Sequence, residues 1–507
     1  MSSAQNKLIS ILLGDARTSA AIISLFLSVW SVYLDDVVNT DGVLYLRTAE
    51  LLAHGQWQDA FALYKWPFYA FLIAVISQIT GLGFEYSAHA LNAALTALAV
   101  AVFLSLVREL GADRKTLIAA AIVVLLFPGL NRYRAFVIRD AGYIAFYLLA
   151  LLLFIKDLKG PRPALRLGWV ASIFVATLFR IEGFVFLVAL PLVRQWLLST
   201  GATARAALLA GSAGAALLIL GALGWWSFSG PQLPTAPEWG GLLGDLWHST
   251  TATLSARIDT IAGALHDRYE RAFAYAVLLA ALCVLLLWEV LVTLTPLYTA
   301  LAGHAVYRRL VFQDPQIRKI WLQLIALHLL VLAAILIIRL FLTGRFPLAL
   351  SLTLLLAVPF SLAALYARWQ EDRPRGVRRN WVFLLVCILL ILTGADGLYR
   401  PTGKRHLKEA GLWVKNHTPT QTTLFSNDPL ILWYSARSRH ERPSGYAWDL
   451  VLELARSRRL LQYDYLAVRV KRTQSEQEHS LVEALGKRPV AVFANRKGDK
   501  ALVFALH

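Results

Sequence analysis

The stretch that decides the fold is AAIISLFLSVWSVYLDD, residues 20–36, which is followed at once by VVNTDGVLYL, residues 37–46. Its apolar part, 20–34, carries no charged residue and ends directly in Asp35 and Asp36. Carboxylates are costly to keep where a membrane span meets water, so Asp35 and Asp36 indicate a functional site. The order of residues therefore predicts a membrane span that opens into an acidic, functional loop.

Composition extends this interpretation to the rest of the chain. Of the 507 residues, 57% are hydrophobic and only 16% are charged, and the mean hydropathy is +0.55. A soluble protein has roughly 45–50% apolar and about 25% charged residues, whereas apolar segments of about 20 residues, the length that crosses ~30 Å of hydrocarbon, recur here. These segments lie at about 19–35, 66–83, 86–107, 116–131, 138–155, 166–179, 182–198, 204–227, 272–300, 320–342, 346–366 and 380–398.

The distribution of positive charge predicts the topology. The net charge is +18, but lysine and arginine gather in the short connections 108–115, 156–166, 308–319 and 368–379, which share one side if every segment from residue 86 onward spans. The positive-inside rule makes that side the cytoplasm, so the charge does not indicate a nucleic-acid partner. Instead it indicates a multi-pass membrane protein.

Segment 66–83 decides on which side the acidic loop lies. If it spans, Asp41 is cytoplasmic; if it is re-entrant or juxtamembrane, Asp41 faces outward. The loop 35–65 carries five acidic residues and two basic ones, a balance that favours the outer, periplasmic side. We therefore predict about eleven spans plus juxtamembrane helices, with 66–83 among the latter.

Composition changes after residue 398, where charges and turn residues separate short apolar runs. Strands are predicted at 422–425, 465–470, 490–493 and 501–505, and helices at 404–416, 447–459 and 474–485. This alternation is typical of a small α/β domain. The predicted domains are a transmembrane domain over 1–398, whose outer loop and juxtamembrane helices occupy 35–85, and a periplasmic α/β domain over 399–507.

The outer loop contains a candidate helix with an acid in its first turn. Thr40 is a predicted N-cap, and Asp41 suits the positive end of the helix dipole. Asp41, Tyr45 and two further residues, Ala49 and Leu52, then share one face. A non-functional alternative stays open, in which Asp35, Asp36 and Asp41 are solvated helix caps at the membrane interface. Lys65 likewise either anchors the interface beside an aromatic residue or meets a phosphate.

Further charges cluster at the outer ends of later spans. They are Arg132, Arg134, Arg139, Asp140, Arg180, Glu182 and Arg345. Outer arginines go against the positive-inside trend and so indicate an anionic partner. The alternative is that Arg139 with Asp140, and Arg180 with Glu182, are self-neutralising pairs at helix entrances.

These residues resemble those of the GT-C membrane glycosyltransferases, in the branch of the aminoarabinose–lipid A transferases and protein O-mannosyltransferases. The resemblance covers essentially the whole chain and is carried by Asp41, Tyr45, Ala49, Leu52, Gly55, Trp57, the run Lys65–Tyr69, Asp140, the turn Arg180–Gly183 and Arg345. The chain departs from many relatives in having Asp41-Gly42 where they have Asp-Glu, and Trp66-Pro67 where they have a double proline. Those departures bear on the donor sugar and the acceptor.

The resemblance implies transfer of a sugar from a polyprenyl-phosphate donor to a hydroxyl of an envelope glycolipid, glycan or protein, on the non-cytoplasmic face. It implies Asp41 as general base, with Asp140 orienting a base, holding an arginine or helping to bind a divalent metal ion. The implied cations for the donor phosphate are Lys65, Arg132, Arg134, Arg139 and Arg345. The other implied substrate-binding residues are Asp36, Tyr45, Tyr69, Arg180 and Glu182.

Other classes stay open. A lipid or solute transporter usually places its polar residues at the membrane midplane, often in repeated halves, and Glu289 and Arg339 are such mid-span charges. An O-antigen-ligase-type transferase also uses outer arginines but does not need the loop after the first span. An oligosaccharyltransferase requires an acid after a tryptophan pair, where this chain has Trp225-Trp226-Ser227. A non-catalytic scaffold on the same fold is the last alternative.

Overall fold

The computed structural model describes residues 15–198, 251–263, 271–372, 381–399, 403–437 and 447–507. The chain forms two compact units. The helical unit comprises Met1–Ser28, Asn92–Arg134 and Arg139–Leu398, and the α/β unit comprises Val29–Leu91, Ala135–Ile138 and Tyr399–His507. The span predicted over 204–227 and the tryptophan pair within it lie outside the described residues.

The helical unit is built from helices of 4 to 26 residues, of which α2 and α6 continue into the α/β unit. They are α2 (Ala16–Leu34), α6 (Phe84–Glu109), α7 (Arg114–Leu125), α8 (Pro128–Asn131), α9 (Asp140–Lys159), α10 (Pro163–Phe179), α11 (Gly183–Leu198), α14 (Arg271–Leu294), α15 (Pro296–Tyr307), α16 (Pro315–Arg339), α17 (Leu348–Leu355), α18 (Val358–Asp372) and α19 (Trp381–Leu398).

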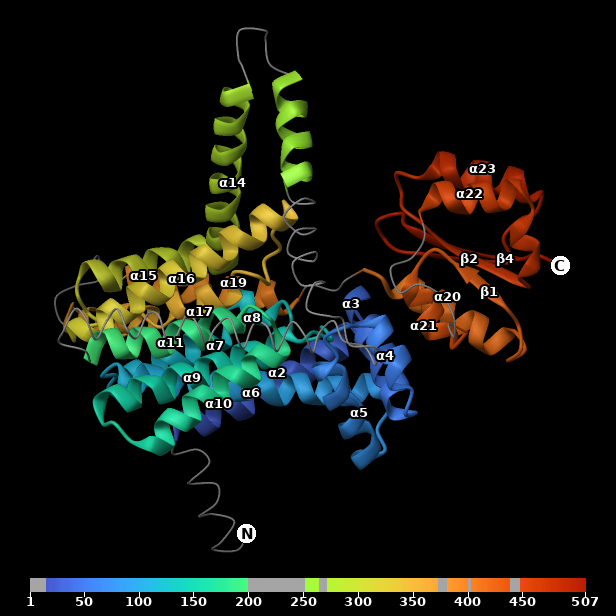
Figure 1. The fold of residues 1–507 in the computed structure, drawn as a ribbon. Coiled ribbons are helices and arrows are strands. Elements are labelled where there is room, and N and C mark those ends of the chain that lie inside the picture. The colour runs from blue at the N-terminus through green and yellow to red at the C-terminus, as the bar shows by residue number, and fades with distance from the viewer. Residues whose placement is uncertain (1–14, 199–250, 264–270, 373–380, 400–402, 438–446) are drawn as a thin grey trace, which may run out of the picture. The chain divides into compact units, whose positions relative to one another are not determined.

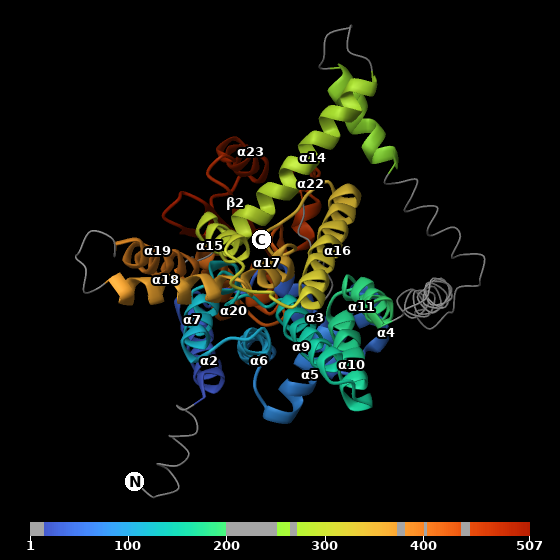
Figure 2. The same cartoon turned by 90° about the vertical axis from the view of Figure 1, so that its left-hand side faces the viewer.

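Helix length and composition make this a multi-pass membrane protein. Among the described residues, seven helical segments are long and apolar enough to cross a membrane, and three apolar helices are shorter. The predicted polytopic helical class is thereby confirmed, while the predicted number of eleven spans stays a prediction. Helix α9 packs against α10 and α10 against α11, and α7 packs against α18; Figure 2 shows both groups.

The α/β unit combines the segment after the first span with the C-terminal residues. Its helices and strands are α3 (Thr40–Ala53), α4 (Trp57–Leu63), α5 (Phe68–Thr80), α20 (Arg405–His417), β1 (Leu424–Ser426), α21 (Pro429–Ser435), α22 (Trp448–Arg456), the 3-10 turn η3 (Arg459–Gln462), β2 (Tyr465–Val470), α23 (Ser475–Leu485), β3 (Ala491–Ala494) and β4 (Lys500–Ala505). Helix α5 has 13 residues, about 20 Å at 1.5 Å per residue, against ~30 Å of hydrocarbon. That length favours the juxtamembrane interpretation.

The C-terminal residues fold into a layered sheet, as predicted. Its strand order is β1-β2-β4-β3, with β1 parallel to β2 and both other pairs antiparallel. Leu466, Val468 and Val470 alternate along β2 and enter an apolar core with α22 and α23, because successive side chains of a strand point to opposite faces. Helices α20 and α21 contact the sheet as well (Figure 1). Helix α21 was not predicted.

Candidate functional site

The candidate general base lies at the start of α3, directly after an irregular connection. Residues 35–39 have no regular secondary structure, and α3 begins at Thr40. Asp41 is therefore in the first helical turn, where unpaired amides and the helix dipole favour a negative charge. The predicted N-cap was wrong by one residue: Asn39 holds that position, and its side chain accepts a hydrogen bond from the Val137 amide at 2.7 Å instead of capping the helix.

The face of α3 predicted from spacing is the buried one. Tyr45, Ala49 and Leu52 are all buried. The Tyr45 ring meets the rings of Tyr64 and Tyr69 edge-on, at centroid distances of 5.4 and 5.2 Å. Tyr45 and Tyr69, which the resemblance implied as substrate ligands, thus belong to the packing that supports the helix bearing Asp41.

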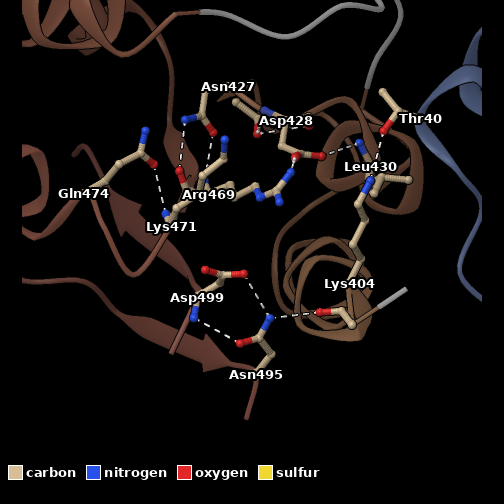
Figure 3. Close-up of polar contacts among 12 residues, drawn as sticks. Thr40, Lys404, Asn427, Asp428, Leu430, Arg469, Lys471, Gln474, Asn495 and Asp499 are labelled. Carbon is tan, nitrogen blue, oxygen red and sulfur yellow. Dashed lines mark hydrogen bonds and ion pairs between the residues drawn. The ribbon is translucent and has the colours of Figure 1, made fainter. Parts of the chain in front are cut away.

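Two lysines from α20 approach the same connection. Lys404 stands at the N-cap of α20 and its Nζ donates to Thr40 Oγ1 at 3.2 Å (Figure 3). One helical turn later, Lys408 Nζ donates to Asp36 Oδ2 at 2.8 Å and to the Asp36 carbonyl at 3.0 Å. Burial lowers the pKa of Lys404, while the nearby carboxylates of Asp428 and Asp41 act in the opposite direction. Lys404 is thus a cation within electrostatic reach of the candidate base.

Tyr434 of α21 completes this set of contacts. Its hydroxyl accepts a hydrogen bond from the Val38 amide at 3.0 Å and lies 3.4 Å from the Asp36 carbonyl and from Glu85 Oε1. The Lys408 ammonium lies 4.9 Å from the centre of the Tyr434 ring. A buried aromatic ring and a cation therefore hold the backbone just ahead of Asp41.

Behind Lys404, a second group of polar residues fixes the start of α20. Arg469 of β2 lies 3.3 Å from Asp428 Oδ2, and the Asn427 side chain bonds the backbone of Arg469 in both directions. Asn495 donates to the carbonyl of Gly403, beside Lys404. Figure 3 shows these side chains around Lys404: Arg469 comes from β2, Asn427 and Asp428 from the connection between β1 and α21, and Asn495 from the turn after β3.

In the helical unit, Arg180 joins two acids into a buried cluster. Its Nη1 is bonded to Asp140 Oδ1, and its other nitrogens bond both oxygens of Glu182 at 2.6 and 3.2 Å. The Arg180 side chain is 6% exposed and that of Asp140 is 5% exposed. Burial alone would raise the pKa of Glu182, but Arg180 outweighs it and lowers that pKa to about 2. Of the roles implied for Asp140, the geometry favours that of holding an arginine.

Aromatic rings and further cations surround this cluster. The Arg180 guanidinium lies 4.9 Å from the Phe346 ring centre, and that of Arg345 lies 5.8 Å from it. Tyr133 has its hydroxyl beside Gly344. Burial raises the pKa of Tyr133, the charge of Asp140 adds to the effect, and Arg132 and Arg345 oppose it. Tyr133 was not predicted as a site residue, although it lies among the candidate phosphate ligands.

The remaining predicted arginines differ in their contacts and in their burial. Arg139 occupies the N-cap position of α9 and acts electrostatically on Glu182. Arg132 lies 3.8 Å from Asp396. Arg134 is 3% exposed, and its Nη1 bonds the Ser24 carbonyl and the hydroxyls of Ser24 and Ser28. Arg134 therefore ties the connection before α9 to the first span.

A divalent ion is bound by several histidine, cysteine or acidic side chains that lie close together. Among the described residues, no three such side chains come together in a metal-binding arrangement. We accordingly assign no residue to a metal ion.

Asp41, Asp36 and Lys65 all lie in the α/β unit, and Asp140, Arg180, Glu182 and the candidate arginines lie in the helical unit. Lys404, Lys408 and Tyr434 were missed because they follow Asp41 by more than 360 residues. The arginines were predicted because basic residues on the outer side of the membrane indicate an anionic partner. The same argument applies to Lys404 and Lys408, whose i, i+4 spacing places them on one helix face.

Comparison with known proteins yields structural neighbours. No family model matches, and no curated protein matches in sequence. Among solved structures, the chain is similar to the archaeal oligosaccharyltransferase AglB from Archaeoglobus fulgidus in complex with an inhibitory peptide and a dolichol-phosphate. The TM-score is 0.49 and the sequence identity is 14%, and the match covers 96% of this chain and 74% of that one. It is also similar to ArnT from Cupriavidus metallidurans bound to undecaprenyl phosphate, with a TM-score of 0.39 and 14% identity over 96% of this chain and 97% of that one. The roles of individual residues below rest on the geometry of this chain.

Proposed function

We propose that the chain is an integral-membrane glycosyltransferase that moves a sugar from a polyprenyl-phosphate donor to an acceptor hydroxyl, with Asp41 as the general base. The single observation that carries this proposal is the position of Asp41. It lies in the first turn of a helix that follows a membrane span after only five residues, within electrostatic reach of Lys404. A transporter usually places its polar binding residues near the bilayer midplane instead.

The proposed step follows from these residue types. The acceptor oxygen attacks the anomeric carbon of the sugar and forms the glycosidic bond, while its proton passes to the Asp41 carboxylate, which must lie within hydrogen-bond reach. The bond between the anomeric carbon and the phosphate oxygen breaks, and its electron pair leaves with the polyprenyl phosphate. Fixed cations stabilise the charge that develops on that oxygen.

The cations proposed for the donor phosphate are Lys65, Arg132, Arg139 and Arg345. Arginine suits this task because its planar guanidinium can contact a phosphate through two hydrogen bonds. Arg134 is omitted, since it is buried against serines of the first span. Arg180 is proposed to support the site through its buried pairs with Asp140 and Glu182. The proposed acceptor is a glycolipid, glycan or protein on the periplasmic side of the bacterial inner membrane.

The test begins with a strain that lacks the protein. Mass spectrometry of its envelope glycolipids and surface proteins should reveal one missing sugar, which identifies donor and acceptor. Complementation with Asp41→Asn should fail, with a loss of about 10²–10⁴-fold in transfer, while purified Asp41→Asn still binds undecaprenyl phosphate as a probe. Asp59→Asn, an exposed acid in the first turn of α4, is the matched control and should complement. Full transfer by Asp41→Asn, or cytosolic labelling of a cysteine at residue 41, would refute the proposal.

A further inference from the structure

The connection between the first span and α3 cannot set its own geometry. Residues 35–39 form neither helix nor strand, so their backbone conformation depends on contacts from elsewhere in the α/β unit. Asp41 follows this connection directly, and small displacements of a catalytic group reduce the rate steeply. The contacts on this connection are therefore candidates for functional control.

The Val137 amide contacts this connection through Asn39, and three side chains contact the segment as well: Lys404, Lys408 and Tyr434, which we call the loop clamp. They engage three residues from Asp36 to the start of α3: Lys408 bonds Asp36, Tyr434 bonds the Val38 amide and Lys404 bonds the Thr40 hydroxyl. Contacts at three successive points along this segment fix its path. The residue after the last contact is Asp41.

The clamp is itself held in place. Lys408 is packed over the Tyr434 ring and its side chain is 19% exposed. Helices α20 and α21 pack closely on each other, and Gly411 permits this, because a Cβ there would lie 2.8 Å from the Ile431 carbonyl. The ends of both lysines are thus presented from a rigid pair of helices.

Resting on the proposed function of Asp41, we propose that Lys404, Lys408 and Tyr434 are positioning residues that hold Asp41 in the orientation needed to take the acceptor proton. The Asp36 partner of Lys408 is itself 61% exposed. An ion pair that is open to solvent on one side adds little to the stability of a fold. We infer that the role of the Lys408–Asp36 pair is geometric, so its loss should lower turnover more than it lowers the stability of the fold.

The test uses the full-length protein with the donor and acceptor that the deletion strain identifies. Lys408→Met should lower kcat by roughly 10–100-fold, as a misplaced catalytic group does, with the KM for donor within about twofold because the proposed donor cations are untouched. Tyr434→Phe should act in the same direction by removing the hydroxyl that accepts from Val38. Lys415→Met, an exposed lysine on the same helix, is the control and should keep wild-type kcat.

A reversal of charges separates positioning from simple loss of structure. Lys408→Asp combined with Asp36→Lys should recover a substantial part of kcat, whereas each single change should not. Unchanged kcat in Lys408→Met, or an equal loss in the single and double variants with normal thermal stability, would overturn the inference. If Asp41→Asn is inactive in the same assay, that result leaves the proposed function intact; if Asp41→Asn is active, the proposed function itself fails.

Discussion

Replacing Arg180 with methionine should destabilise the protein strongly, because it strips two buried acids of their partner. Arg180 bonds both Asp140 and Glu182, and its own side chain is 6% exposed. Arg180 holds the pKa of Glu182 at about 2, against an ordinary value of 4.5, which corresponds to roughly 3 kcal/mol of stabilising interaction. Removing one partner of a buried ion pair typically costs about 3–5 kcal/mol, so the two lines of reasoning agree.

The assay is unfolding of the purified protein in detergent, followed by tryptophan fluorescence. Arg180→Met should lower the free energy of unfolding by about 3 kcal/mol or more, and Arg180→Lys should recover only part of it, because a point charge cannot bond two oxygens of a carboxylate in a plane. The matched control is Arg405→Met. Arg405 pairs with Glu409 at 3.4 Å but is 83% exposed, and such i, i+4 pairs contribute about 0.3–0.5 kcal/mol.

The free energy of unfolding should also depend on pH in a direction that the Arg180–Glu182 pair predicts. Because the pKa of Glu182 is lower in the folded protein than in the unfolded chain, its contribution is fully present above pH 4.5 and is lost as the pH falls toward 2. Arg180→Met should flatten this part of the stability profile. If Arg180→Met is as stable as the wild type at neutral pH, or keeps the wild-type acid profile, the buried-cluster reasoning is refuted.

Two other predictions concern the loop and the donor. Gly42→Ala should destabilise the protein by about 1–3 kcal/mol and reduce transfer, because its new Cβ would lie 2.7 Å from a Val38 methyl carbon. Gly83→Ala is the control. It has open space around it and should leave thermal unfolding unchanged. Lys65→Ala and Arg345→Ala should each weaken binding of undecaprenyl phosphate about tenfold or more, as loss of one charged hydrogen bond does; unchanged affinity in both would remove them from the proposed phosphate site.

Local patterns account for the features that the sequence predicted well. The buried face of α3 follows from helical spacing alone, and burial of Tyr45, Ala49 and Leu52 confirms it. Strand β2 was predicted with its observed bounds, Tyr465–Val470, because β-branched and apolar residues alternate there between turn signals. Strands β3 and β4 form an antiparallel pair, and the turn between them has Gly498 at φ +88°, a conformation in which glycine meets no steric penalty.

Long-range pairing accounts for what was missed. No local pattern says that Lys408 meets Asp36, since 372 residues separate them. Helix α21 was missed because its seven residues, Pro429–Ser435, are too few to show a helical period. The Thr40 prediction erred for a related reason: the hydroxyl that would cap its own helix instead accepts a bond from Lys404, a residue that a local argument cannot include.

The two clusters of charged residues are organised on different principles, and this difference has consequences for how each responds to change. Arg180 and Glu182 are two residues apart, so a short turn brings them together, and burial makes their pairing strong. The contacts on residues 36–40 instead come from side chains far along the chain. The two lysine contacts are open to solvent on one side, so each of those two is weak by itself. A cluster of the first kind fails as a unit when one member is removed. One of the second kind loses its geometry stepwise while the fold survives, which is the behaviour expected of contacts that serve to place a reacting group.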